Sequence, residues 1–337
     1  MERDFEIYDL GDVTLQSGAV LPDAKLAYKT HGALNPARDN VIVIPTHYTG
    51  THVSNDGYIE AMPALDPARY FIISINMFGN GVSSSPSNTP APCDGPRFPG
   101  TTLFDNVACQ HRLLTEQFNV NHIALVMGWS MAACQTYQWA AQFPHMMDAI
   151  LPFCGSARTS PHNIVFLDGV KAALKADSSF NGGDYAGPPV AGLKAFARVY
   201  AGWGFSQTFY RDDHYRDQGY ETIEDLLVDW EREHLEWDAN DLLHMLWSWQ
   251  HGDISANETY GGDFERALGA IQARAIVAPC TTGLYFPPED NALEVAHMPN
   301  AELRPFESPW GHCVASPGER PEFSAFINDA VAELLAG

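Results

Sequence analysis

The sequence HIALVMGWSMAACQTYQWAAQF, from His122 to Phe143, combines an apolar run, a short turn and a helical pattern without an intervening loop. The run is apolar on both faces, as buried parallel strands require. Gly128 and Ala132 lie on either side of Ser130, and small residues are needed where a strand turns sharply into a helix. The segment therefore predicts a strained strand–turn–helix unit that exposes Ser130 at the N-terminus of a helix.

This setting makes Ser130 a candidate nucleophile. The N–H groups and the dipole at a helix N-terminus favour a developing oxyanion. One oxyanion donor is expected from the N–H of Met131, which follows the nucleophile. The other is expected from the loop after the strand pattern VIVIPTHYTG, where Tyr48 supplies its backbone N–H. The arrangement is typical of an acyl-transfer site.

Further apolar runs, rich in β-branched residues, predict the remaining strands of a parallel sheet. They are NVIVIPTHY (40–48), YFIISINMFG (70–79), DAILPFCG (148–155) and ARAIVAPCTT (273–282). Helical patterns cover 102–118, 131–143 and 322–336. The alternation predicts an α/β fold with a mostly parallel central sheet and helices on both faces. At the N-terminus, FEIYDLGDVTL and KLAYKTHG alternate polar and apolar residues, which predicts an antiparallel entry to the sheet.

A long segment rich in Trp and Tyr, at 156–268, interrupts this alternation. Its clearest patterns, IEDLLVDWEREHLEW and LLHMLWSWQH, are helical. We therefore expect a helical lid at 156–268, inserted between an N-terminal core part at 1–155 and a C-terminal core part at 269–337. A Pro- and Gly-rich loop at 86–100 is long enough to be functional rather than a mere connection.

Composition argues against several classes of partner. The 337 residues include 19 Lys and Arg against 42 Asp and Glu, a formal net charge of −23, which repels nucleic acid and anionic membrane surfaces. We find neither the roughly 18 consecutive apolar residues of a membrane span nor a signal-peptide pattern, and we expect a cytoplasmic protein. The six Cys show no metal-binding spacing and no nucleotide-binding motif occurs, so we expect no metal and no cofactor.

The general base is expected late in the chain, because strand–turn–helix serine enzymes order their catalytic residues as nucleophile, acid and histidine. Of the thirteen His, His312 has both the position and the context. It follows the strand pattern AELRPFE and lies in the turn ESPWGHCVASPG. Others, including His47 and His52, are expected to be structural.

Seven segments, in the same order, resemble the blocks of the homoserine O-acetyltransferase family of α/β-hydrolase proteins. They are THYTGTH, INMFGNGVSSSPS, FPGTTLFDNVACQHRLL, GWSMAACQTYQWAAQFP, EWDANDLLHMLWSW, LYFPPED and WGH. The resemblance covers nearly the whole chain and implies the α/β-hydrolase fold with an inserted helical lid. It also implies a double displacement, in which Ser130 takes an acyl group, His312 relays the proton and an acceptor removes the acyl group. A homodimer formed through the lid helices is a further implication.

Two positions depart from that family's pattern. The family has an Asp three residues before the Phe of its FPP block, where it orients the catalytic His, and Phe286 places Gly283 at that position. Our candidate substitute is Asp290 in the following turn. The alternatives are Glu289, water with a backbone carbonyl, an altered residue, or loss of catalysis. The family also has an acidic residue directly after the His, suited to an ammonium group, where this chain has Cys313.

These features favour hydrolysis of an ester, thioester or amide, with a small acyl compound as substrate and water as acceptor. Two alternatives stay open: an O-acyltransferase that uses acyl-CoA and a small hydroxyl acceptor, and a catalytically weakened ligand-binding member of the fold. Trp129 and Arg158 are candidate substrate contacts, although Arg158 also suits a salt bridge in the lid. The lid aromatics suggest an apolar substrate, although they also suit core packing.

Overall fold

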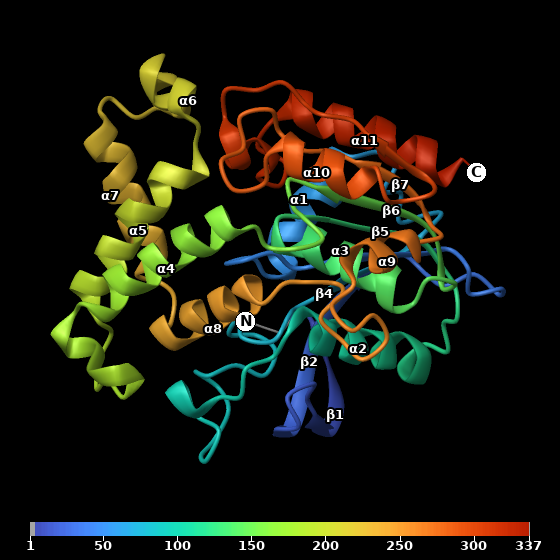
Figure 1. The fold of residues 1–337 in the computed structure, drawn as a ribbon, viewed down its shortest axis with the longest axis horizontal. Coiled ribbons are helices and arrows are strands. Elements are labelled where there is room, and N and C mark those ends of the chain that lie inside the picture. The colour runs from blue at the N-terminus through green and yellow to red at the C-terminus, as the bar shows by residue number, and fades with distance from the viewer. Residues whose placement is uncertain (1–3, 337) are drawn as a thin grey trace.

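The apolar runs form the middle of an eight-stranded sheet in the computed structural model, which describes residues 4–336. The strand order is β1-β2-β4-β3-β5-β6-β7-β8 (Figure 1). Strand β2 pairs antiparallel with β1 and β4, and every later pair is parallel, as the sequence predicted. The strands are β1 (Glu6–Thr14), β2 (Val20–His31), β3 (Val41–Pro45), β4 (Phe71–Ile75), β5 (Ile123–Trp129), β6 (Met147–Phe153), β7 (Arg274–Val277) and β8 (Ala301–Leu303).

Helices cover both faces of the sheet, and a second group of helices lies beside it (Figure 1). The core helices are α1 (His52–Ala61), α2 (Leu103–Arg112), α3 (Met131–Gln142), α9 (Phe264–Gly269), α10 (Pro288–Val295) and α11 (Pro321–Leu335). The inserted helices are α4 (Pro161–Lys175), α5 (Val190–Gly204), α6 (Gln207–Arg211), α7 (Ile223–His234) and α8 (Ala239–Gln250). The expected α/β-hydrolase architecture with a helical insertion is confirmed. None of the helices in the described part of the chain has the length and apolarity needed to cross a membrane.

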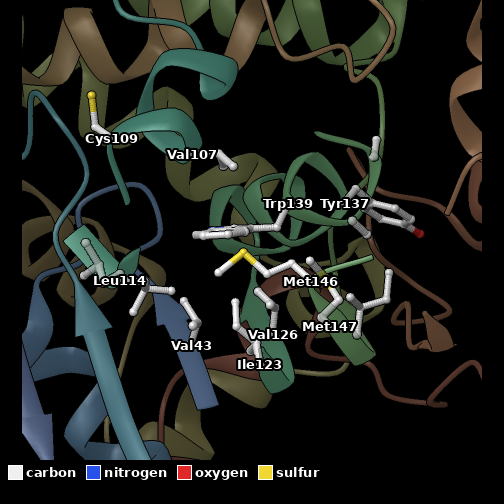
Figure 2. Close-up of a cluster of buried hydrophobic side chains, with 14 of the residues drawn as sticks. Val43, Val107, Cys109, Leu114, Ile123, Val126, Tyr137, Trp139, Met146 and Met147 are labelled. Carbon is white, nitrogen blue, oxygen red and sulfur yellow. The ribbon is translucent and has the colours of Figure 1, made fainter. Parts of the chain in front are cut away.

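Alternate side chains of the central strands pack into two hydrophobic clusters, one on each face of the sheet. In β3, Val41 and Val43 join the first cluster, whereas Ile42 and Ile44 join the second. Residues of α2, α3 and α9 complete the first cluster, and residues of α1 and α11 complete the second. Figure 2 shows the first cluster, where Trp139 of α3 lies over side chains of β5. Because successive side chains point to opposite faces, a strand covered on both sides must be apolar throughout.

The insertion begins and ends at a narrow neck. Arg158 and Asp253 pair as an antiparallel bridge, and their side chains form an ion pair with 2.7 Å between Nε and Oδ2. Directly after this neck, Ile254 and then helix α9 pack in the first hydrophobic cluster of the core. The core therefore resumes earlier than residue 269, where the sequence placed the boundary, because α9 buries its apolar side chains against the sheet and not among the lid helices.

Candidate active site

Ser130 lies between the end of β5 and the first residue of α3. Its φ of 59° and ψ of −125° form a strained conformation that residues other than glycine rarely adopt. The turn requires small neighbours, because a Cβ on Gly128 would lie 2.5 Å from the Cβ of Ala132. A Cβ on Gly155 would likewise lie 2.7 Å from the carbonyl oxygen of Ser130. The local geometry is that of the strand–turn–helix unit predicted from the sequence.

A cavity of about 460 Å³ opens beside this turn and brings core and lid residues together. Ser130 and His312 both line it. Its other walls come from the loop after β3, from α5 and α7 of the lid, and from the segments around α10 and after β8. The remaining lining residues are His47, Tyr48, Thr49, Val53, Ser54, Gly57, Trp129, Tyr200, Trp230, Glu233, His234, Tyr285, Cys313, Ser316, Pro317 and Glu319. This volume suits a small organic substrate.

Aromatic rings surround the imidazole of His312. It stacks on Trp129 with 4.9 Å between ring centroids, and it lies 4.6 Å from the ring of Tyr285. Burial, assisted by the nearby His47, holds the pKa of His312 well below its usual value. The imidazole is therefore neutral near pH 7, which is the state that a general base needs. Within residues 4–336 no hydrogen bond engages either ring nitrogen of His312.

The structure does not bring Asp290 to His312. Asp290 lies in the first turn of α10, where burial and the neighbouring Glu289 raise its pKa while His162 opposes that rise. In the described part of the chain no hydrogen bond or ion pair joins Asp290 to His312. The groups that shift the pKa of His312 do not include a carboxylate. Asp290 instead occupies the early helix position where acidic residues favour the helix dipole.

Gly283 lies beside the loop that carries His312. The hydroxyl of the adjacent Thr282 donates to the Ser308 carbonyl at 2.6 Å and accepts from the Gly311 N–H at 3.1 Å. These two bonds tie the segment before residue 283 to the segment before residue 312. Because Gly283 has no side chain, the imidazole lacks a carboxylate at the position where the sequence pattern calls for one.

Two backbone N–H groups near Ser130 are free to meet an oxyanion. Within residues 4–336, the N–H of Met131, the first residue of α3, and the N–H of Tyr48 donate to no backbone carbonyl. Thr49 follows with φ 57°, and its hydroxyl donates to the Tyr48 carbonyl at 2.6 Å. The loop also requires Gly50, because a Cβ there would lie 2.6 Å from the ring of His47.

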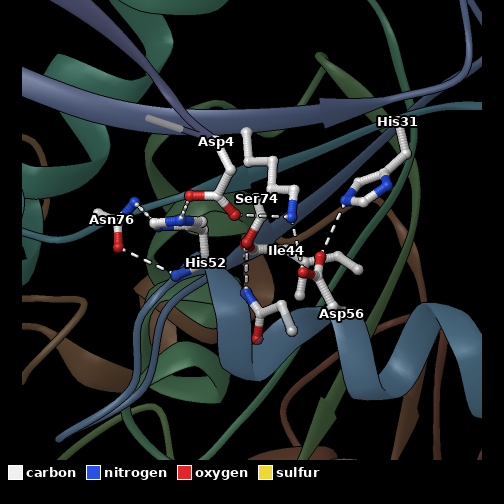
Figure 3. A network of polar contacts seen from close by, with 9 residues as sticks. Asp4, His31, Ile44, His52, Asp56, Ser74 and Asn76 are labelled. Carbon is white, nitrogen blue, oxygen red and sulfur yellow. Dashed lines mark hydrogen bonds and ion pairs between the residues drawn. The ribbon is translucent and has the colours of Figure 1, made fainter. Parts of the chain in front are cut away.

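A polar network joins this loop to the start of α1 and to the segment after β4, and Figure 3 shows the part of it formed by His52, Asp4 and Asn76. His52, the first residue of α1, has its Nε2 3.2 Å from Asp4 and its Nδ1 3.1 Å from Asn76. The Asn76 side chain accepts from the backbone N–H of His52 at 3.1 Å. Asn80 donates to Asn76 at 2.9 Å and to the Gly50 carbonyl at 3.1 Å. Sequence reasoning missed these asparagines, and the only signal was that they belong to the INMFGNGVSSSPS block.

Of the two candidate substrate contacts, Trp129 lines the cavity and Arg158 does not. The Trp129 ring lies 4.6 Å from that of His47, in addition to its stack on the imidazole of His312. Arg158 pairs with Asp253 and donates to Ser255 at 2.9 Å. It therefore holds the neck of the lid, which is the alternative role that the sequence left open.

The Pro- and Gly-rich loop at 86–100 is attached to the lid rather than to the catalytic cavity. Asp241 of α8 accepts hydrogen bonds from the backbone N–H and the hydroxyl of Ser87, at 2.9 Å and 2.5 Å. Burial raises the pKa of Asp241 to about 7. A separate cavity of about 400 Å³ lies between this loop and α8, and neither Ser130 nor His312 lines it. The loop thus connects the core and the lid.

Comparison with known proteins agrees with this geometry. The model of the alpha/beta hydrolase fold family matches residues 40–314. A probable esterase of Corynebacterium glutamicum is 40% identical over 91% of this chain and 89% of its own length. An ethyl acetate hydrolase of Pseudomonas veronii is 38% identical, with the same coverage of 91% and 89%.

The resemblance seen in the sequence blocks is also confirmed. A homoserine O-acetyltransferase of Chlorobium chlorochromatii is 31% identical over 88% of this chain and 86% of its own length. Among solved structures, an acetylester hydrolase from Corynebacterium glutamicum superimposes with a TM-score of 0.93 at 36% identity, covering 99% of this chain and 96% of the other. The chain is thus similar to esterases over its whole length and, at lower identity, to acyltransferases.

Proposed function

From the premise that this chain belongs to the α/β-hydrolase fold family and is an acyl-transferring enzyme within it, we propose that it hydrolyses small acetyl esters. The observation that carries this proposal is the strained Ser130 facing the same cavity as a neutral, buried His312. An acetyl group as the acyl part of the substrate is supported by the relative named as an ethyl acetate hydrolase, which is more similar to the chain than the named transferase is.

The proposed reaction has two halves. Ser130 attacks the ester carbonyl while its hydroxyl proton passes to His312, and the N–H groups of Tyr48 and Met131 stabilise the oxyanion. The alcohol then leaves with the proton from His312, and the acyl group stays on Ser130. In the second half, water gives its proton to His312 and attacks the acyl-enzyme, the acyl–oxygen bond to Ser130 breaks, and His312 returns the proton to the Ser130 oxygen as the acid leaves. Trp129 supports the imidazole by stacking, and neither metal nor cofactor takes part.

The proposal is tested by the intact mass of the protein after reaction with a fluorophosphonate, together with p-nitrophenyl acetate hydrolysis. One adduct that is absent from Ser130→Ala, with hydrolysis lost in the same variant, supports a serine esterase. A folded protein that gives no adduct and no hydrolysis contradicts it and favours a ligand-binding member of the fold. Gly283 is the specific observation behind that second candidate, because it leaves His312 without a carboxylate.

Acyl transfer to an acceptor other than water is the other candidate, supported by the homoserine O-acetyltransferase relatives. It would use acyl-CoA as a co-substrate and a small hydroxyl compound as acceptor. Cys313 favours water, because it replaces the acidic residue that directly follows the catalytic histidine in the transferase pattern. Acyl-CoA turnover that depends on an added hydroxyl acceptor would favour transfer over hydrolysis.

We also propose that two chains associate through their lids in the cytoplasm. Exposed aliphatic side chains gather on α4, α5 and α7, where solvent contact is unfavourable. They are Ile164, Val165, Val190, Val199, Ile223 and Val228. Sedimentation of a monomer at micromolar concentration would remove the dimer, and cell fractionation tests the location.

A further inference from the structure

The mouth of the catalytic cavity carries two carboxylates that the proposed reaction does not use. Glu233 comes from α7 of the lid, and Glu319 comes from the segment after His312. Burial, Asp229 and then Glu319 raise the pKa of Glu233, so the charge of Glu319 acts on Glu233 across the cavity wall. Two carboxylates in the lining of one cavity favour a positively charged group beside them.

Among residues 4–336, Arg232 opposes the rise in the pKa of Glu233 but forms no ion pair with it. Among the described residues that line the cavity, none is Lys or Arg, and neither glutamate takes part in an ion pair. The two nearest arginines in sequence are engaged elsewhere. Arg232 pairs with Asp229, and the Arg320 guanidinium lies 3.4 Å from the centre of the Trp310 ring. Neither carboxylate therefore has a basic ion-pair partner in the described part of the chain.

Aromatic walls stand next to the carboxylates. Trp230 of α7 and Tyr200 of α5 both line the cavity, with 5.8 Å between their ring centroids. A Cβ on Gly204 would touch Trp230 at 2.8 Å and the sulfur of Cys313 at 3.2 Å, which places the indole next to the residue that follows His312. The faces of Trp and Tyr attract cations, and an aromatic pocket with nearby carboxylates is how proteins bind alkylammonium groups.

A buried histidine adds an acceptor to the same wall. His234 is 6% exposed and lines the cavity. Its Nδ1 lies 2.8 Å from the Trp230 carbonyl, which can only accept, so Nδ1 carries the proton and Nε2 keeps its lone pair. Burial lowers the pKa of His234, and Nε2 has no partner within residues 4–336. An acceptor without a donor in a buried position points to a ligand group that is positive or donates hydrogen bonds.

We propose that the alcohol part of the substrate carries an ammonium group, which binds between Glu233, Glu319 and the aromatic rings of Trp230 and Tyr200. This inference rests on the proposed esterase function and specifies its substrate class. The acyl C–O bond breaks, the ammonium-bearing alcohol leaves with the proton from His312, and water completes the hydrolysis. The cavity holds such an ester, since drug-sized and smaller ligands occupy pockets of roughly 300 to 1,000 Å³.

The test compares acetylcholine with 3,3-dimethylbutyl acetate, which has the same shape without the charge. We expect kcat/KM to be about tenfold higher for the cationic ester. This ratio corresponds to the combined free energy of one exposed ion pair and one cation–π contact. Glu233→Gln and Glu319→Gln should each reduce this ratio about threefold, and the double variant should bring it close to one. Glu236→Gln removes a charge that acts on Glu233 from outside the cavity, and it should reduce the ratio less than either cavity variant does.

A binding measurement that needs no turnover tests this inference independently of the proposed esterase function. Calorimetric titration with choline and with 3,3-dimethylbutan-1-ol measures the same preference in a protein that turns nothing over. Tighter binding of choline that depends on Glu233 supports the inference even where p-nitrophenyl acetate is not hydrolysed. Equal binding of the two alcohols, or an equal loss of preference in Glu236→Gln, would overturn it.

Discussion

Replacement of Gly283 by Asp should restore a carboxylate partner to His312 and raise turnover. The position suits the change, because Thr282 ties this segment to Gly311, directly before the imidazole. A Cβ on Gly283 would lie 3.3 Å from the carbonyl oxygens of Cys280 and Phe286, so the neighbours need to shift by only a few tenths of an ångström. The backbone of Gly283 does not have a positive φ, and the substitution therefore adds no left-handed strain.

The expected gain follows from what a triad carboxylate contributes. Its loss costs on the order of 10⁴ in turnover, which corresponds to about 5 kcal/mol of transition-state stabilisation. A carboxylate placed without further optimisation should recover about 10² to 10³ of this, since an error of 1 Å costs on the order of 10². Gly283→Asp should also raise the pKa of His312, because the negative charge favours the imidazolium.

The assay is the pH dependence of kcat/KM for p-nitrophenyl acetate, measured with the melting temperature of each variant. Gly283→Asp should raise the plateau and move the acid limb of the profile to higher pH. Gly283→Asn has the same shape without the charge and should give a much smaller gain. A folded Gly283→Asp protein with unchanged turnover and an unchanged acid limb would refute the view that the missing carboxylate limits catalysis.

Three other expectations follow from the structure. Because burial lowers the pKa of His312, kcat/KM of the unmodified protein should fall only below pH 6.5. A midpoint of this fall above pH 6.5 would contradict a neutral, buried imidazole. Gly128→Ala should abolish labelling of Ser130 by the fluorophosphonate and lower the free energy of urea unfolding by about 1 to 3 kcal/mol. The reason is that the added Cβ would lie 2.5 Å from the Cβ of Ala132. The control Gly169→Ala, with open space on exposed α4, should stabilise by about 0.5 to 1 kcal/mol. Burial raises the pKa of Glu294 from 4.5 to about 7 in the folded protein. Between these pH values the unfolded chain has released the Glu294 proton while the folded chain keeps it. The free energy of unfolding should therefore fall as pH rises from 4.5 to 7. The loss should reach about 3 kcal/mol above pH 7, and a Glu294→Gln protein with the same pH dependence would count against this account.

Local patterns were enough to predict the fold and to select Ser130 and His312, two candidate site residues that line the same cavity. Continuous apolar runs specify buried strands, since both faces of such strands must be covered, and the central strands of the sheet lie where these runs do. Ser130 was recognisable because the steric demands of its turn fall on immediate neighbours, Gly128 and Ala132. His312 was recognisable because chain order and a late turn leave few alternatives.

Contacts between segments far apart in the sequence determine which residues surround and position the candidate site. Asp290 and Arg158 were plausible from their neighbours in sequence, yet only packing shows that the first lies early in α10 and that the second holds the neck of the lid. Asn76 and Asn80 contact the loop after β3 because the parallel pairing of β3 and β4 brings the two following loops together.

The sequence by itself determined the class of fold, the candidate nucleophile and the gap at Gly283, because each depends on spacing along a few residues. Tertiary structure alone decided what surrounds the cavity, since its walls come from six segments of the chain. The pairing of Glu233 in the lid with Glu319 in the core is the clearest case. These two glutamates are more than eighty residues apart in the sequence. Whether their charges interact depends on the distance between them in the folded chain, because the interaction of two charges falls with their separation.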